Sequence, residues 1–168
     1  MGFRKANDAF KAVDPSFVPY IEHLHTKMQV LVAMAPVTPV SLPSVMCKKG
    51  IYLLSEGNKH LYVGRSNEIT ARLLRHCRPG ATHRMAAFAF RLAREATGNL
   101  KATYRKGAGS RAALALDPEF LRAFTEAKAR IRRMSVRFVE ETDPTKQALL
   151  EIYVSVVLQT PYNDFDNH

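Results

Sequence analysis

Cysteine is scarce in this sequence, and no hydrophobic run is long enough to cross a membrane. The two cysteines, Cys47 and Cys77, are too few for a disulfide framework and are typical of a reducing compartment. The most apolar stretch, residues 30–40, is interrupted by Pro36 and Pro39, whereas a membrane span needs roughly 20 consecutive apolar residues. The start of the chain also has no pattern of a secretory signal. These absences favour a cytoplasmic protein with no membrane partner.

The chain of 168 residues has the length of one ordinary domain, which buries roughly 70% of the surface of its unfolded chain. Hydrophobic residues make up 46% and charged residues 24%, as in globular proteins, so a disordered tail or a fibrous repeat is excluded. We divide the chain into two parts. Residues 1–49 form a helical extension with a proline-rich connector, and residues 50–168 form a core with a basic helical insertion at about 83–133.

Positive charge is concentrated in the middle of the chain. The formal net charge is +10, and the stretch from Arg65 to Arg133 holds sixteen Lys and Arg against five acidic residues. The remainder holds nine basic and ten acidic residues, so the whole net charge belongs to the middle. A concentrated positive field attracts a phosphate backbone and displaces its counterions, which favours a nucleic acid as the partner. The alternative is a soluble surface that is merely rich in arginine.

The first third of the sequence predicts helix followed by a hairpin. Apolar residues at helical spacing over 17–31 predict one helix capped by Ser16, and a shorter helix is predicted over 7–12. Residues 36–49 have the prolines of an extended connector. The short β-type runs at 50–54 and 61–63, separated by a turn-forming stretch, predict a hairpin.

Helices dominate the rest of the chain. We expect Asn67 to cap a helix that follows the hairpin, and further helices over 83–96, from Arg111, over 117–133 and over 143–159, with a strand at 135–140 between the last two. This order predicts an α/β fold of the α+β type, in which a small mixed three-stranded sheet is flanked by helices.

Two tripeptides on the predicted hairpin, GIY at 50–52 and YVG at 62–64, precede an arginine and a histidine at helical spacing. Arg72 lies eight residues after the glycine of the second tripeptide, and His76 lies one turn further along the helix. This pattern resembles the paired signature of the GIY-YIG nucleases, with valine in place of the second isoleucine. Family members have an arginine at the same spacing, and several restriction and homing members have such a histidine.

The end of the chain extends this resemblance. The family places a metal-binding glutamate on its last helix with a Tyr-Asn pair beyond it, and here Glu151 and the pair at 162–163 hold those places. The resemblance covers 50–76 and 134–163, and it departs from repair-type members at Arg65, where they tend to have lysine. Without the further domains of repair members or the recognition tails of homing members, it implies a stand-alone nuclease of restriction, mobile-element or phage-related type.

The resemblance implies a metal-dependent DNA endonuclease that hydrolyses phosphodiester bonds. Tyr52 would act as general base or orient the attacking water, with Tyr62 beside it. Arg72 would hold a nonbridging phosphate oxygen, because its planar fork matches phosphate. His76 would donate to the phosphate or assist proton transfer, and Glu151 would be the sole protein carboxylate on Mg²⁺ or Mn²⁺.

A second group of residues supports this site or binds the nucleic acid. Gly50 and Gly64 would let the backbone pass closely, Arg65 would add positive field, and Asn163 would orient backbone or a tyrosine. The residues expected to contact nucleic acid are Arg65, Arg75, His83, Arg84, Arg130, Arg132 and Arg133.

Several alternatives stay open. A catalytically inactive nucleic-acid-binding module would share the same charge, and so would a nuclease directed at RNA. Double-strand cleavage would require a homodimer or two visits, because a single site cuts one strand. The His and Cys residues near 76–83, with Cys47, match no standard zinc spacing. Residues 1–49 would serve as a recognition arm, a dimerisation helix or a packed brace.

Overall fold

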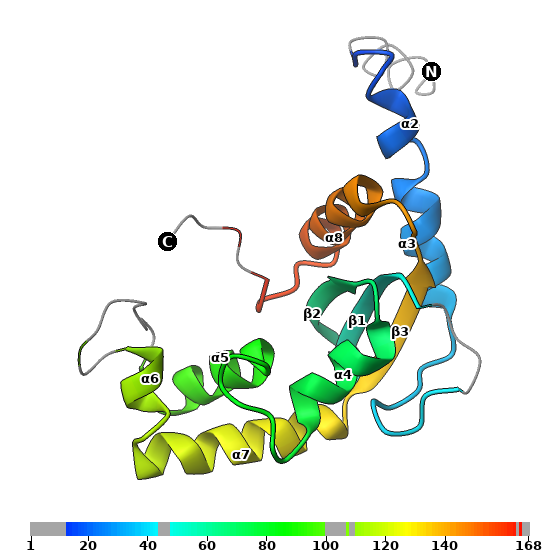
Figure 1. Cartoon of the computed structure of the whole chain (residues 1–168). Coiled ribbons are helices and arrows are strands. Elements are labelled where there is room, and N and C mark those ends of the chain that lie inside the picture. The colour runs from blue at the N-terminus through cyan, green and yellow to red at the C-terminus, as the bar shows by residue number, and fades with distance from the viewer. Residues whose placement is uncertain (1–12, 44–47, 100–106, 108–109, 164, 166–168) are drawn as a thin grey trace.

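The structure, a computed structural model, describes residues 13–43, 48–99, 107, 110–163 and 165. A three-stranded sheet in the order β2-β1-β3 lies between α3 and α8 on one side and α4 on the other, while α5, α6 and α7 group together beyond α4 (Figure 1). The elements are α2 (Val18–Ile21), α3 (Leu24–Ala33), β1 (Gly50–Glu56), β2 (Lys59–Ser66), α4 (Ile69–Cys77), α5 (Ala87–Ala96), α6 (Arg111–Leu114), α7 (Pro118–Arg132), β3 (Ser135–Glu140) and α8 (Pro144–Val157).

The predicted α+β class, the hairpin and the third strand are confirmed, but the sheet is antiparallel throughout rather than mixed. β1 pairs antiparallel with β2 on one edge and with β3 on the other. Arg130, near the end of α7, forms two hydrogen bonds of 2.7 Å with Glu56 at the end of β1. The chain therefore enters β3 beside the end of β1, and it must run antiparallel to β1.

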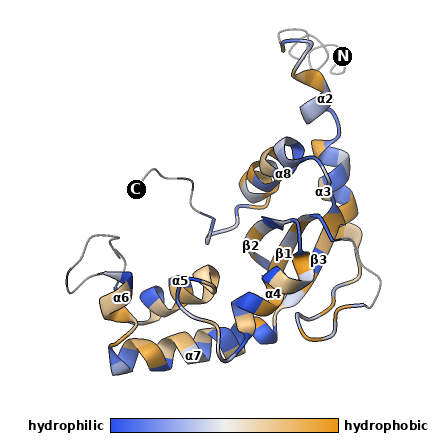
Figure 2. Cartoon of the chain, viewed as in Figure 1, coloured by the Kyte–Doolittle hydropathy of each residue, from blue (hydrophilic) through white to orange (hydrophobic). Residues whose placement is uncertain are grey.

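Alternation along β1 divides the buried residues between two cores. Tyr52 and Leu54 face α4, α5 and α7, whereas Ile51 and Leu53 face α3 and α8. Figure 2 shows hydrophobic residues on the strands and alternating with hydrophilic ones along α7. Each fully buried aliphatic side chain contributes about 1.5–3 kcal/mol, so both faces of the sheet have to be covered.

The N-terminal helix predicted over 17–31 is two helices in the structure. The break lies at His23, whose φ of −103° and ψ of 1° are not helical, between α2 and α3. Ser16 does not cap α2; its backbone and hydroxyl both donate to the carboxylate of Asp14. The helix predicted over 7–12 lies outside the described residues.

The described part of residues 1–49 packs against the sheet. Met28 and Leu31 of α3 are buried against the sheet, and Lys27 donates to the carbonyl oxygen of Glu140. Val37 forms a backbone bridge with Val136 of β3. α3 therefore covers the face of the sheet opposite α4, whereas Val37 packs against the core on the α4 side.

Two helices of the core begin at the caps that the sequence predicts, and two do not. Asp117 accepts from the backbone of Phe120 at 2.7 Å and caps α7, and Asp143 caps α8, as predicted. Asn67 does not cap α4; its oxygen accepts instead from the Gln147 amide at 3.2 Å. α5 begins at residue 87 rather than 83. The backbone around 82–86 forms a turn instead, and Arg111 donates a hydrogen bond to the carbonyl oxygen of residue 83.

No helix in the described part of the chain is long and apolar enough to cross a membrane.

Candidate active site

Tyr52 and His76 form a buried pair at the centre of the site. The Tyr52 hydroxyl and His76 Nε2 share a hydrogen bond of 2.8 Å, and both side chains are 0% exposed. Tyr52 comes from the central strand β1, which places it between the two other strands. His76 comes from the last turn of α4, which packs across that face of the sheet. The two tripeptide motifs and the helix after them therefore meet through a direct contact.

Tyr62 lies beside this pair and retains access to the surface. Its ring centroid is 6.3 Å from that of Tyr52 and 5.8 Å from that of His76. Its other side stacks on Phe88 of α5, with centroids 4.7 Å apart and planes 11° apart. Tyr62 is partly buried and Tyr52 is fully enclosed, so Tyr62 is the tyrosine of the two that has exposed surface. The sequence had assigned the water to Tyr52, whose hydroxyl is hydrogen-bonded to His76.

Arg72 is the cation of this cluster. It lies one turn before His76 on α4 and is half-buried. Burial raises the pKa of Tyr52 well above its usual value and also raises the pKa of Tyr62, while the charge and hydrogen bonding of Arg72 oppose both shifts. Both phenols therefore keep their protons near neutral pH and act as hydrogen-bond donors.

His76 is neutral in this setting. Burial, reinforced by the charge of Arg72, lowers its pKa to about 3. Its Nδ1 has no hydrogen-bond partner among the described residues. Because the ring has no exposed surface, it does not reach a phosphate directly, which corrects that part of the expectation. The ring acts through Tyr52, whose hydroxyl it holds in place.

Two glycines are required by close contacts. At Gly50, where φ is +153°, an added β-carbon would lie 2.0 Å from the carbonyl oxygen of Val139 in β3. At Gly64, it would lie 2.4 Å from the ring of Tyr52. The first glycine therefore permits strand pairing, and the second makes room for a site residue.

Glu151 and Arg65 form an ion pair at the edge of this cluster. Arg65 Nε, on β2, donates to Glu151 Oε2 on α8 at 2.9 Å, and the side chains are 48% and 18% exposed. Burial raises the pKa of Glu151, and the charges of Arg65 and then Arg72 oppose that shift. The charge of Glu151 in turn raises the pKa of both Tyr52 and Tyr62, so it belongs to the same electrostatic cluster.

Glu151 offers a carboxylate, which already pairs with Arg65 at 2.9 Å. Among the described residues, no group of three or more His, Cys, Asp or Glu side chains converges that could hold a metal ion. A carboxylate oxygen is the ligand that Mg²⁺ prefers, and Mg²⁺ commonly keeps waters and phosphate oxygens as its other ligands. Within the described part of the chain the candidate zinc ligands do not form a site; Cys77 is buried, with its thiol pKa raised by burial, and Cys47 lies outside the described residues.

Asn163 is tied to the strand that carries Tyr62. Its side chain accepts from the backbone nitrogen of Val63 and donates to the carbonyl oxygen of the same residue, both at 2.8 Å. Thr160 donates to the same amide oxygen at 2.8 Å. Asn163 therefore orients backbone, and it pins the segment after α8 onto the outer edge of β2.

The expected nucleic-acid contacts divide into exposed and engaged side chains. Arg130 is engaged in the bidentate pair with Glu56 that joins α7 to the sheet. His83 is half-buried with its ring 6.2 Å from that of Phe90, and burial lowers its pKa. Arg65 is exposed but paired with Glu151. The other exposed members are Arg75, Arg84, Arg132 and Arg133.

Sequence reasoning missed the contribution of α5. Phe88 stacks on Tyr62 and meets His76 edge-on at 6.3 Å, and Arg91 Nη1 donates to the carbonyl oxygen of Tyr162 at 2.6 Å. The sequence predicted a helix over 83–96, but no pattern indicated which residues Phe88 would contact. Sequence patterns do not indicate these contacts, because they join residues that lie far apart in the chain.

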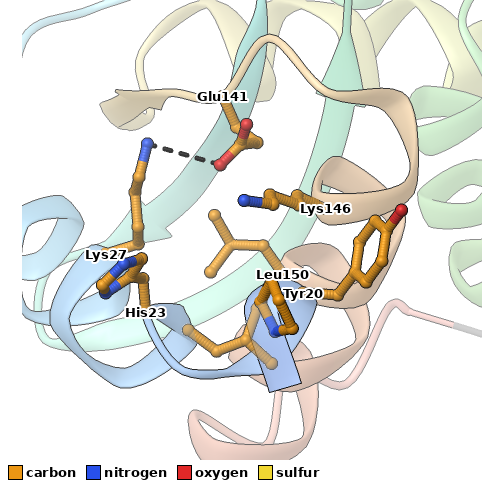
Figure 3. Close-up of a pocket in the computed structure, with 8 residues that line it drawn as sticks. Tyr20, His23, Lys27, Glu141, Lys146 and Leu150 are labelled. Atoms are coloured by element: carbon orange, nitrogen blue, oxygen red, sulfur yellow. Dashed lines mark ion pairs between the residues drawn. The ribbon is translucent and has the colours of Figure 1, made fainter. Parts of the chain in front are cut away.

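A cavity of about 280 Å³ lies between α2, α3 and the start of α8. Figure 3 shows Lys27 and Glu141 at its rim, joined by an ion pair of 3.4 Å, with Leu150 among the residues lining it. It belongs to the face of the sheet opposite Tyr52, because Leu150 is part of the other core. It therefore has no connection with the tyrosine cluster. Its lining residues are Pro19, Tyr20, His23, Leu24, Lys27, Glu141, Lys146 and Leu150.

Comparison of the chain with family models, curated proteins and solved structures gave no match.

Proposed function

We propose that the protein is a metal-dependent endonuclease that hydrolyses phosphodiester bonds of DNA. The observation that carries this proposal is one electrostatic cluster built from β1, β2, α4 and α8. It joins two tyrosines, Arg72 and Glu151, and the Tyr52–His76 hydrogen bond lies inside it. These are the residue types that phosphodiester hydrolysis requires: a cation for the phosphate, hydroxyls that orient water, and a carboxylate for a metal.

The exposure of each side chain determines its proposed role. Arg72 holds a nonbridging phosphate oxygen and neutralises the charge that develops on it. Tyr62, which reaches the surface, donates its hydroxyl hydrogen bond to a nonbridging phosphate oxygen, and its oxygen accepts a hydrogen bond from the attacking water. Tyr52 and His76 stand behind it and fix the position of the cluster. Glu151 would hold a divalent cation, which would supply Lewis-acid polarisation of the phosphate.

The charge distribution supports a polyanionic substrate. The stretch from Arg65 to Arg133 contains the whole positive excess of the chain, and Arg75, Arg132 and Arg133 are exposed on α4 and at the end of α7. Contacts of such arginines with phosphates position a duplex without reading its sequence. They supply affinity that falls with salt concentration.

The test is cleavage of supercoiled plasmid by the purified protein, with Mg²⁺ or with EDTA. Glu151→Gln removes the carboxylate charge and keeps the shape of the side chain, and Glu126→Gln, at an exposed position of α7, is the matched control. We expect nicking or linearisation that requires metal, that persists in the control and that is lost in Glu151→Gln with DNA binding retained. Binding without cleavage under any divalent metal would favour the non-catalytic module, and cleavage of RNA as readily as DNA would favour an RNA-directed nuclease.

A further inference from the structure

Arg65 and Glu151 meet on the face of the sheet that α8 covers. Arg65 follows Val63 by two residues on β2, so the two side chains point to the same face. Val63 is buried in one core with Leu150, and Glu151 is the next residue of α8. The pair therefore lies beside this core, at an outer strand of the sheet.

This ion pair occupies the carboxylate to which the proposed function assigns a divalent cation. Arg65 Nε donates to Glu151 Oε2 at 2.9 Å. The side chain of Glu151 is 18% exposed, whereas that of Arg65 is 48% exposed. Glu151 is held beside the packed residues of α8, so Arg65 is the partner that can turn toward a ligand in solution.

Glu151 also belongs to the electrostatic cluster that contains Arg72 and Tyr62. A phosphate held by Arg72 would therefore enter the field of both members of the ion pair. The carboxylate of Glu151 repels a phosphate, and the guanidinium of Arg65 attracts it. While the pair is closed these two effects oppose each other, so Arg65 adds little affinity for DNA.

A phosphate is a direct competitor of this carboxylate. The guanidinium of arginine binds carboxylates and phosphates through the same planar fork of N–H donors. An ion pair with one half-exposed member is screened by water and contributes little to stability, so its exchange for another anion has a low cost. The positive excess of residues 65–133 raises the local concentration of phosphates.

We propose that the Arg65–Glu151 ion pair is an autoinhibitory contact, which a phosphate of the DNA backbone opens by taking Arg65 from Glu151. This inference rests on the proposed nuclease function and concerns the regulation of the same site. In the closed state, the Glu151 carboxylate occupies the place of a phosphate at Arg65. In the open state, Arg65 binds the DNA, and Glu151 offers its carboxylate to the cation. Binding of DNA and binding of metal are therefore coupled through Arg65.

A double-mutant cycle on DNA affinity tests the competition in the absence of metal. The variants are Glu151→Gln, Arg65→Gln and the double variant. Binding of a labelled duplex in EDTA is measured by fluorescence anisotropy at several KCl concentrations. Glu151→Gln removes the competing anion and keeps the shape of the side chain, and thermal melting of each variant shows whether the fold is retained.

We expect Glu151→Gln to tighten DNA binding when Arg65 is present, because the guanidinium no longer has to leave a carboxylate. The gain should be about 2- to 5-fold larger than the gain from the same change in the Arg65→Gln protein, as for an ion pair of this exposure. An equal gain in both proteins would reflect only the loss of a negative charge, and it would overturn the proposal. A smaller gain in the presence of Arg65 would overturn it too.

The ion pair of Lys27 and Glu141 is the matched control. Its side chains are 34% and 12% exposed, and it lies beside β3, at the other edge of the sheet from β2. The cycle of Lys27→Gln and Glu141→Gln should show no coupling in DNA affinity. Equal coupling in the two cycles would mean that opening any ion pair of this kind affects binding, and it would contradict an autoinhibitory role for the Arg65 contact.

A second measurement uses single variants and leaves Glu151 unchanged. Binding of Mn²⁺ in the absence of DNA is followed by electron paramagnetic resonance, in which the free ion gives the signal. We expect Arg65→Gln to bind Mn²⁺ about 2- to 5-fold more tightly than Arg75→Gln, an exposed change on α4 with the same loss of charge. Equal binding by the two variants, or binding by neither, would overturn the coupling of Arg65 to the cation.

The cycle in EDTA also separates this inference from the nuclease proposal. If the wild type binds DNA and does not cleave it with any divalent metal, the nuclease proposal is overturned, and the cycle still decides whether Glu151 competes for Arg65. If the coupling is absent while cleavage requires metal and Glu151, the inference alone is overturned. If the wild type binds no DNA at any salt concentration, both are overturned.

Discussion

The phenol ring of Tyr52 occupies the space that a side chain at position 64 would need. A β-carbon on Gly64 would lie 2.4 Å from both Cζ and Oη of that ring. The two residues face each other across β1 and β2, where they are register partners. Gly64 is therefore a glycine because of a tyrosine on the neighbouring strand, and the identities of the two residues depend on each other.

Gly64→Ala is expected to displace Tyr52 and to lower the free energy of unfolding by about 1–3 kcal/mol, the usual cost of overpacking a core. Gly80→Ala is the control, because a β-carbon there would meet no atom within 4 Å. Urea unfolding measures both variants, and plasmid cleavage shows whether the displaced hydroxyl matters to activity. Equal stability of the two variants would contradict the contact described here.

Stability should fall on mild acidification because of His76. Its pKa is about 3 in the folded protein, below the usual 6.5, so between these values only the unfolded chain binds the proton. This group therefore contributes stability above pH 6.5 and loses it as the pH falls, by about 1.4 kcal/mol per pH unit. Urea unfolding at pH 7, 6 and 5 measures the slope. His76→Gln should reduce it, and an unchanged slope would mean that His76 is protonated in the folded state.

Arg72→Gln and Tyr62→Phe should slow DNA cleavage by about 100- to 1,000-fold, as for loss of one contact that stabilises a transition state. The measurement is single-turnover cleavage with saturating protein, which isolates the chemical step from binding. Arg75→Gln is the matched control, because Arg75 lies on the same helix and is exposed. A rate of Arg72→Gln equal to that of the control would remove Arg72 from the chemistry.

Arg130 should matter to stability more than to DNA binding. It shares two hydrogen bonds of 2.7 Å with Glu56, and the two side chains are 42% and 36% exposed, so solvent screening limits their coupling to about 0–1 kcal/mol. A double-mutant cycle of Arg130→Ala and Glu56→Ala, followed by urea unfolding, measures that coupling. The pair Arg132→Ala and Arg133→Ala should instead lower DNA affinity and its salt dependence. A larger loss of DNA affinity from Arg130→Ala than from the exposed pair would contradict this division.

Local signals in the sequence were enough to predict most of the secondary structure. The strand at 135–140, the helices capped by Asp117 and Asp143, and the hairpin all depend on alternation, caps and turn residues within a few positions of each other. One error occurred where a distant partner competed with a local one. Asn67 was expected to cap α4 and bonds Gln147 of α8 instead.

The candidate site likewise has features that the sequence predicts and features that depend on the folded structure. The spacing of its tyrosines, Arg72 and His76 is a property of the sequence, because a hairpin and a following helix position such residues with few alternatives. Three features are not properties of the sequence alone: the burial of the Tyr52–His76 pair, the exposure of Tyr62 and the ion pair of Arg130. They depend on α5, α7 and α8 packing onto the sheet, and packing joins residues whose separation along the chain carries no signal. The chain by itself therefore determined which residues are available for chemistry, and the folded structure determined which of them are enclosed, paired or open to a substrate.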